Sequence, residues 1–178
     1  MNLPNKLTLM RVFIVPAVAA ILLIGRGNGA ETAALILYIA AMATDYADGY
    51  LARKYQLITN FGRFMDPLAD KLLVLSVLIC MVSLEKAPAW AVILVLAREI
   101  SISGFRLIAA ERGIVISAGK LGKIKTTLQN LWIVSLLLPF DGQWTVILSE
   151  VLMWCALLLT VVSFVGYIKT NIRVLKEN

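Results

Sequence analysis

Six apolar stretches, separated by short charged segments, run through the 178-residue sequence. A helix that crosses a membrane needs about 20 mostly apolar residues. Only 16% of the residues are charged, whereas about a quarter are charged in an ordinary soluble domain. We therefore predict an all-α polytopic membrane protein with six transmembrane helices in a single domain, residues 1–178. The predicted spans are 7–24, 33–54, 62–84, 89–110, 124–138 and 144–168. The fifth is short, so we expect its helix to begin earlier or the bilayer to adapt to it.

Lysine and arginine gather on one side of this predicted topology. An even number of spans places both termini on the same side, and cations favour the cytoplasmic side. The segments after spans one, three and five are poor in cations, whereas both termini and the other two gaps are rich in them. We predict a multi-pass protein with both termini in the cytoplasm. The formal net charge of +6 then indicates attraction to anionic lipid head groups and not nucleic-acid binding.

Histidine is absent, and the two cysteines lie inside apolar stretches without a CxxC spacing. Histidine-based catalytic triads and His/Cys zinc sites are therefore excluded. We predict that Cys80 and Cys155 are small buried hydrophobic residues, and the sequence does not support a disulfide framework.

Besides Glu150, which lies near the outer end of span six and is interpreted as an interfacial acid, five acidic residues fall within predicted spans, where each charge costs at least about 2.5–3.5 kcal/mol at the bilayer centre. Some interaction must compensate them. The five are Asp45, Asp48, Asp66, Asp70 and Glu99.

Four of these acids form two helical faces. At 100° per residue, one arc of about 100° on span two holds Asp45, Asp48, Gly49 and Ala52. On span three, Gly62, Asp66 and Asp70 spread over about 80°. The linker 55–61 is short enough to require an antiparallel helical hairpin. We therefore expect the four carboxylates to converge at the cytoplasmic end of the bundle.

Carboxylates that converge without histidine or cysteine favour hard divalent cations. We expect Mg²⁺ or Mn²⁺, and two ions in preference to one, because two ions can neutralise both the attacking and the leaving oxygen of a phosphate. The chemistry indicated is phosphoryl-type transfer at a site that faces the cytoplasm.

Other interpretations of the same residues remain open. Asp66 before Pro67 could cap a helix that begins there. Asp45 and Asp48 could form structural ion pairs, with Arg53, Lys54 or Lys71 as the cations. The glycines could only allow close helix packing. At the level of function, the carboxylates could line the cation pathway of a divalent-metal transporter.

The acidic pattern reads Asp45-x2-Asp48-Gly49-x2-Ala52-Arg53-x8-Gly62-x3-Asp66-x3-Asp70. It resembles the signature of the CDP-alcohol phosphotransferase family. The resemblance implies a six-helix membrane enzyme, usually a homodimer, that moves a phosphatidyl group from CDP-diacylglycerol to an alcohol and releases CMP. By the same resemblance, the divalent metals are bound by Asp45, Asp48, Asp66 and Asp70, and Asp70 is also the general base. The residues implied to surround the cytidine diphosphate are Asp48, Gly49, Ala52, Arg53 and Gly62.

Further stretches resemble the bacterial subfamily that uses glycerol 3-phosphate as the alcohol, which implies a place in the bacterial cytoplasmic membrane. They are Asn2-Leu3-Pro4-Asn5 with Leu7, Thr8 and Arg11, then Ala97-Arg98-Glu99, Arg106, Glu111 and the run from Gly119 to Thr126. The other acceptors that the family chemistry leaves open are inositol phosphate, serine and phosphatidylglycerol.

An acceptor that is itself a phosphate monoester needs cations. Four lie near the predicted cytoplasmic ends of spans four and five, and a fifth, Arg98, lies deeper in span four, where a charge needs a specific partner. The candidates for binding its phosphate are Arg98, Arg106, Lys120, Lys123 and Lys125. Arg98, Glu99 and Arg106 share a broad helical face, so Glu99 could hold an arginine in position. For the lysines, membrane topology and attraction to anionic lipid are the alternative explanation.

Overall fold

The computed structural model describes residues 3–25, 27–54, 60–111, 113, 114, 116, 119–140 and 142–171, and the side chains of 3–7, 46–54 and 60–64 lie outside the described part. The described residues form helices and no strands, which confirms the predicted all-α class. The helices are α1 (Leu3–Ile24), α2 (Asn28–Lys54), α3 (Asn60–Ser83), α4 (Ala89–Glu111), α5 (Lys120–Leu136) and α6 (Gln143–Asn171). Each predicted span corresponds to one helix, and α5 begins before residue 124, as its short apolar stretch suggested.

Contacts divide the chain into two compact units. The first contains α1, α2 and α3 and comprises residues 1–87 and 136–141. The second contains α4, α6 and most of α5 and comprises residues 88–135 and 142–178. The acidic signature lies in the first unit, and the basic residues predicted to bind the acceptor lie in the second.

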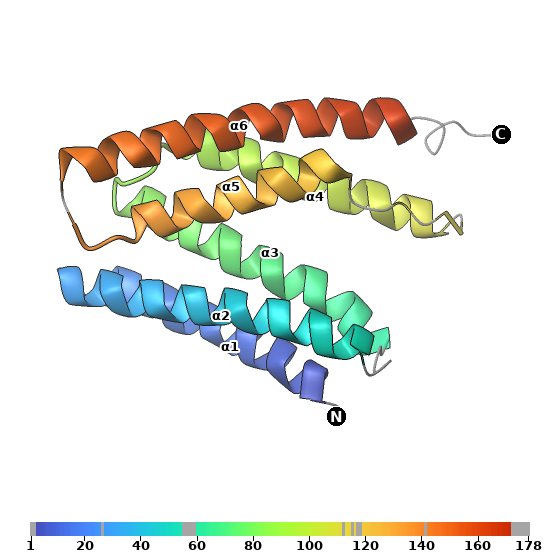
Figure 1. The fold of residues 1–178 in the computed structure, drawn as a ribbon, viewed down its shortest axis with the longest axis horizontal. Helices are drawn as coiled ribbons and strands as arrows, with labels where there is room; N and C mark the ends of the chain where they lie inside the picture. Colours follow the sequence, from blue (N-terminus) through green and yellow to red (C-terminus); the bar gives the residue numbers. More distant parts are fainter. Residues whose placement is uncertain are drawn as a thin grey trace. The chain divides into compact units, whose positions relative to one another are not determined.

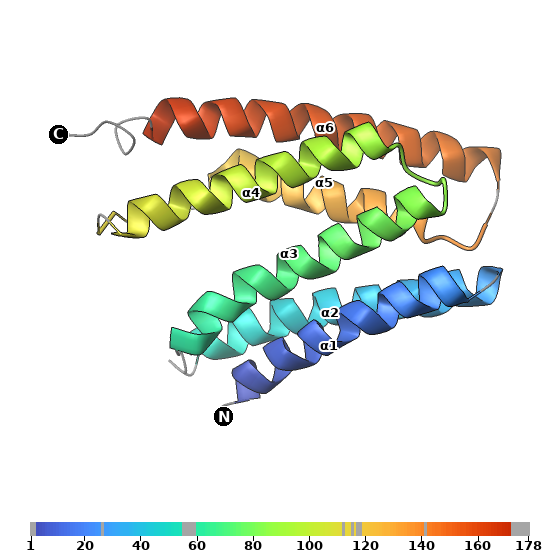
Figure 2. The same ribbon diagram turned by 180° about the vertical axis from the view of Figure 1, so that it is seen from behind.

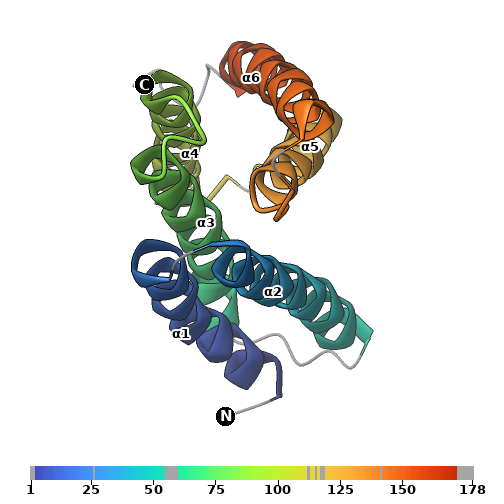
Figure 3. The same cartoon turned by 90° about the vertical axis from the view of Figure 1, so that its left-hand side faces the viewer.

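Helix α1 is the central element of the first unit. It packs along both α2 and α3, whereas α2 and α3 touch each other much less. Fully buried small residues, among them Ala34, Ala41 and Ala69, allow such close approach between helices. Figures 1 and 2 show that the beginning of α1, the end of α2 and the beginning of α3 lie at the same end of this unit, and Figure 3 looks along its helices.

A tight turn joins α1 to α2. Gly25 donates its backbone N–H to the carbonyl of Ile21 over 3.0 Å, and Gly27 has a φ of 72°, a left-handed conformation that glycine adopts without steric cost. A Cβ on Gly25 would overlap the Ile21 carbonyl oxygen and would lie 2.6 Å from the Cβ of Ala30. The close pairing of α1 with α2 therefore depends on glycine at position 25.

We expect Gly25→Ala to lower the free energy of unfolding by about 1–3 kcal/mol, as overpacking does elsewhere. The measurement is unfolding of the purified chain in detergent. Gly29→Ala is the matched control, because nothing lies within 4 Å of a Cβ at that position and alanine favours a helix by up to about 1 kcal/mol. Equal stability of the two variants would contradict the steric argument.

Helix α4 of the second unit ends in a glycine cap. Gly113 has a φ of 71°, and the N–H of Ile114 binds the carbonyl of Ala109 over 2.8 Å, as in a Schellman motif. The reversed chain brings Ile116 onto Phe105 and Ala109, where Tyr167 of α6 also packs. This turn forms one wall of the pocket described below.

Helix α3 continues through Pro67 from its start at Asn60. A helix that begins at Asp66 with Pro67 in its first turn is therefore the wrong interpretation. The assumption of a regular helix through Gly62, Asp66 and Asp70 holds for the backbone.

One helix among the described residues is both long and apolar enough to cross a membrane, namely α6, whose most apolar window has a mean hydropathy of 2.3. Residues 8–24 form a shorter apolar segment. The other predicted spans stay a prediction, and the charged side chains within α2 to α5 lower their apolar character.

Both cysteines are free thiols, in agreement with the absence of a disulfide framework. Cys80 is buried in α3, as predicted, but Cys155 is exposed on α6. The prediction for Cys155 is wrong. Helix α6 is apolar on all sides, so the pattern of apolar residues in its sequence does not distinguish a buried face from an exposed one.

Candidate active site

Two acids of the predicted metal site converge on one arginine. Arg11 of α1 pairs through Nη1 with Oδ1 of Asp45 on α2, and its Nη2 lies 3.8 Å from Oδ1 of Asp66 on α3. The hydroxyl of Thr8 donates a hydrogen bond of 2.5 Å to that same oxygen of Asp66. Asp45 of α2 and Asp66 of α3 therefore both approach the same arginine of α1.

Burial differs sharply within this group. The Arg11 side chain is 2% exposed, whereas the side chains of Asp45 and Asp66 are 45% and 48% exposed. The guanidinium thus lies on the interior side, and both carboxylates reach the surface of the unit. Oxygen donors of this kind, without nitrogen or sulfur, fit a hard divalent cation.

Asp70 lies one helical turn beyond Asp66 on α3. It is partly buried, and it interacts electrostatically with the phenol of Tyr38, a fully buried residue of α2. The role of Asp70 as a general base stays a prediction.

The rest of the signature is known only by its backbone. Asp48, Gly49, Ala52 and Arg53 lie in α2, and Gly62 lies in α3, but their side chains fall outside the described residues. Among the side chains that are described, no three acids come close enough to form a metal centre. The convergence of all four carboxylates, and the contacts around a cytidine diphosphate, stay predictions.

The sequence predicts that Asp45 could form an ion pair, but it does not identify the cation. The structure pairs Asp45 with Arg11, a residue not among the suggested cations Arg53, Lys54 and Lys71, and the side chains of Arg53 and Lys54 lie outside the described part. A cation within the first apolar stretch was the available signal, because a charge in such a position requires a specific partner. The identity of that partner depends on how α1 packs, which local spacing does not reveal.

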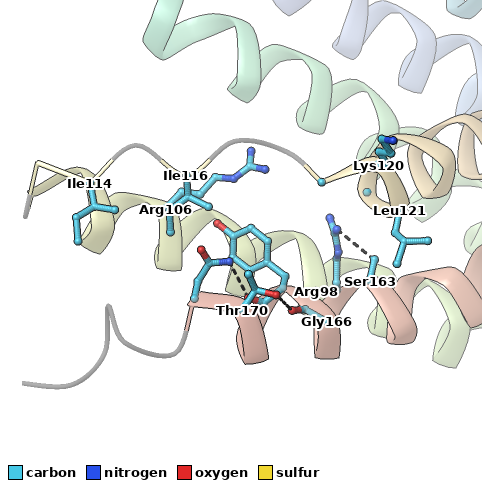
Figure 4. A pocket seen from close by; sticks show the side chains of 13 residues that line it. Arg98, Arg106, Ile114, Ile116, Lys120, Leu121, Ser163, Gly166 and Thr170 are labelled. Atoms are coloured by element: carbon cyan, nitrogen blue, oxygen red, sulfur yellow. Dashed lines mark hydrogen bonds between the residues drawn. The ribbon is translucent and has the colours of Figure 1, made fainter.

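A pocket of about 540 Å³ lies in the second unit (Figure 4). Its walls come from the second half of α4, the segment before α5, the first turn of α5 and the last turns of α6. The lining residues are Arg98, Arg106, Ile114, Ile116, Gly119, Lys120, Leu121, Gly122, Ser163, Gly166, Tyr167, Thr170 and Asn171. Three of the five predicted phosphate-binding cations, Arg98, Arg106 and Lys120, thus lie around one cavity.

Arg98 is held in a defined position. Its guanidinium donates to Glu99 over 2.7 Å and to the Ser163 hydroxyl over 3.4 Å (Figure 4). A Cβ on Gly122 would lie 3.8 Å from Nη2 of Arg98, so the small residue leaves room beside the guanidinium. Arg106, by contrast, lies over the ring of Tyr167 at 5.8 Å from its centre.

The N-terminus of α5 opens into the same pocket. The first N–H groups of a helix have no acceptor within the helix, and the helix dipole adds partial positive charge there. Lys120, Leu121 and Gly122 form that first turn and line the cavity. Arginine, lysine and backbone N–H groups together make a site suited to a phosphate group.

The remaining two predicted cations lie elsewhere on α5. Lys125 is 2% exposed and its ammonium contacts Glu99 over 2.5 Å, and Lys123 is exposed. Neither is among the described residues that line the pocket. Glu99 was expected to hold an arginine, and it binds Lys125 as well as Arg98.

Sequence reasoning missed the polar residues of α6 that line this pocket. Ser163, Thr170 and Asn171 come from the end of a long apolar helix, far from α4 in the chain. Their polar side chains also bond to carbonyls of their own helix, as Thr170 does to Gly166 over 2.8 Å. Such residues are compatible with any helix surface, so the sequence contains no signal of their role.

Known proteins with similar sequences indicate the family to which this chain is related. The sequence model for the CDP-alcohol phosphatidyltransferase family matches residues 1–162. A Bacillus subtilis protein named CDP-diacylglycerol–glycerol-3-phosphate 3-phosphatidyltransferase is 43% identical, with 99% of this chain and 98% of that protein covered. A Rickettsia typhi protein of the same name is 36% identical, covering 94% and 96%. A Mycobacterium tuberculosis protein named probable phosphatidylglycerophosphate synthase is 40% identical, covering 97% and 82%.

Proposed function

The chain belongs to the CDP-alcohol phosphatidyltransferase family, and we propose that it transfers a phosphatidyl group from CDP-diacylglycerol to glycerol 3-phosphate. The products are phosphatidylglycerophosphate and CMP. The choice of acceptor rests on the pocket that Arg98, Arg106 and Lys120 line at the N-terminus of α5. Such a site serves an acceptor with a phosphate group and gives no advantage to serine. The names of the relatives favour glycerol 3-phosphate among the phosphorylated acceptors.

In this proposal Asp70 accepts the proton of the free primary hydroxyl of glycerol 3-phosphate. The hydroxyl oxygen then forms a bond to the lipid-linked phosphorus, and the bond between that phosphorus and CMP breaks. Arg53 pairs with a phosphate oxygen of the nucleotide through its planar fork. Arg98, Arg106 and Lys120 bind the phosphate of the acceptor, and Lys125 helps to hold Glu99 beside Arg98.

Asp45, Asp48, Asp66 and Asp70 would hold the divalent cations, which we propose to be two ions of Mg²⁺ or Mn²⁺. When bound, such ions offset negative charge on the pyrophosphate and on the departing CMP. The oxygen-only donors of Asp45 and Asp66, drawn together from two helices, support this assignment.

We place the protein in the bacterial cytoplasmic membrane. Both units expose large apolar side chains, such as Phe13 at 72%, Ile93 at 63% and Leu158 at 68%, and surfaces of that kind suit contact with lipid. All six helices would span the bilayer, with both termini and the active site on the cytoplasmic side. A homodimer is the expected assembly.

The proposed function is tested by CMP release from CDP-diacylglycerol with purified protein and Mg²⁺, with and without glycerol 3-phosphate. We expect release to depend on glycerol 3-phosphate, and little release with serine, inositol phosphate or phosphatidylglycerol. Preference for another alcohol would overturn the acceptor. Metal flux into proteoliposomes without CMP release would instead favour a transporter.

Two lysines of α5 offer a matched test of the acceptor pocket. We expect Lys120→Gln to raise KM for glycerol 3-phosphate about tenfold, the equivalent of about 1.4 kcal/mol for one charge-assisted hydrogen bond. KM for CDP-diacylglycerol should change little. Lys123→Gln removes the same charge three residues further along, outside the described lining of the pocket, and should have little effect. An equal increase in both variants would mean that general positive charge, and not the pocket, attracts the acceptor.

A further inference from the structure

We propose that Arg11 and Thr8 are positioning residues, which hold one oxygen of each of Asp45 and Asp66 and so orient both carboxylates toward a divalent cation. The inference rests on the proposed role of those aspartates as metal ligands. It assigns a task to α1, which carries none of the acidic signature.

The first support is the position of the arginine. A buried charge has a desolvation cost that only well-placed partners offset, and the Arg11 side chain is 2% exposed while its two carboxylate partners are about half exposed. The guanidinium therefore contacts the carboxylates from the interior of the unit. Its planar fork presents donors in fixed directions, which allows one side chain to reach acids on two different helices.

The second support is the identity of the carboxylate oxygens that α1 contacts. Arg11 contacts Oδ1 of Asp45 and Oδ1 of Asp66, and the Thr8 hydroxyl donates to that same Oδ1 of Asp66. The terminal torsion of an aspartate is otherwise broad, so these contacts restrict the rotation of the carboxylates. Among the described side chains, these contacts with α1 use Oδ1 of each aspartate, and in this proposal Oδ2 of each serves the cation.

A purely structural role would have a different consequence. If Arg11 only tied α1 to α2 and α3, its replacement would lower stability without changing the affinity of the folded protein for a cation. Outer partners that orient metal ligands, by contrast, change metal affinity 10- to 100-fold when they are altered. Cation affinity therefore separates the two roles.

The experiment measures Mn²⁺ binding by electron paramagnetic resonance on the purified full chain in detergent, without substrates. Arg11→Lys keeps the positive charge but loses the fork, and Thr8→Val keeps the shape but loses the hydroxyl donor. We expect each variant to bind Mn²⁺ about tenfold more weakly than the wild type, or weaker still. Lys86→Gln is the control: it breaks the 2.7 Å ion pair with Glu31 in the same unit and should leave Mn²⁺ affinity unchanged.

Asp66→Asn and a thermal unfolding curve for every variant complete the design. Wild-type protein that binds no Mn²⁺ would overturn both the metal site and this inference. If Asp66→Asn abolishes binding but Arg11→Lys and Thr8→Val bind as the wild type does, the metal site stands and the positioning role is overturned, even where stability has fallen. If Arg11→Lys fails to fold, Arg11→Gln is measured in the same way, and Mn²⁺ binding by Arg11→Gln that is unchanged or tighter overturns the positioning role of Arg11. Unchanged Mn²⁺ affinity in Thr8→Val overturns the positioning role of Thr8.

Discussion

Asp70→Asn is expected to lower the rate of CMP release 100- to 10,000-fold, the range over which positioned general bases contribute. Asparagine has nearly the same shape as aspartate but cannot accept the proton of the acceptor hydroxyl. The measurement is CMP formation from CDP-diacylglycerol and glycerol 3-phosphate by purified protein with saturating Mg²⁺. Asp70 interacts electrostatically with buried Tyr38 and lies one turn from Asp66, and asparagine is compatible with the helix at this position.

Two comparisons make this result specific. Glu150→Gln removes an exposed acid on α6 and should leave the rate close to that of the wild type. Because Asp70 is also proposed as a metal ligand, Mn²⁺ binding by the variant tells the two roles apart: a lost rate with retained Mn²⁺ affinity identifies the base. A rate close to wild type in Asp70→Asn would show that another group removes the proton.

Glu99→Gln is expected to lower the free energy of unfolding by about 3–5 kcal/mol, the cost of breaking a buried ion pair from one side. Glu99 is 14% exposed and contacts both Arg98 and Lys125, whose side chains are 12% and 2% exposed. The amide would leave two desolvated cations without their counter-charge. Thermal or denaturant unfolding in detergent measures the loss, and KM for glycerol 3-phosphate should rise as Arg98 loses its support.

The matched control for Glu99 is another glutamate paired with a lysine. Glu31→Gln removes the partner of Lys86, where the side chains are 20% and 27% exposed, and should cost no more than about 1 kcal/mol. The double variant Glu99→Gln with Lys125→Met should recover part of the lost stability, because removing both partners avoids a lone buried charge. A single variant as stable as the wild type would show that the cluster around Glu99 is well hydrated.

The position of the helices could be predicted because apolar stretches and short charged gaps are local properties of the chain. Spacing also predicts the acidic faces of α2 and α3, since residues at steps of three and four share one side of a helix, and the structure brings Asp45 and Asp66 of these faces to one arginine. The grouping of Arg98, Arg106 and Lys120 around a pocket also agrees with expectation, because both stretches flank one short connection. The roles of these residues stay predictions until the experiments above are made.

Other features depended on which helices pack together. Arg11 is part of the subfamily resemblance, but the sequence indicates no partner for it, and only the packing of α1 against α2 and α3 brings it to Asp45 and Asp66. Lys125 is predicted from the sequence to bind the acceptor phosphate, but its position on α5 directs it to Glu99 of α4. Side-chain partners across helices are set by tertiary contacts, and no spacing within one helix encodes them.

The chain alone therefore determined its helical class, the acidic signature and the type of chemistry, because periodicity and residue type act within a few turns of a helix. Only the tertiary structure decided which cations serve as internal counter-charges and which face a cavity. The physical reason is that burying a charge is tolerated solely beside a partner, and partners from distant parts of the sequence meet only once the helices have packed.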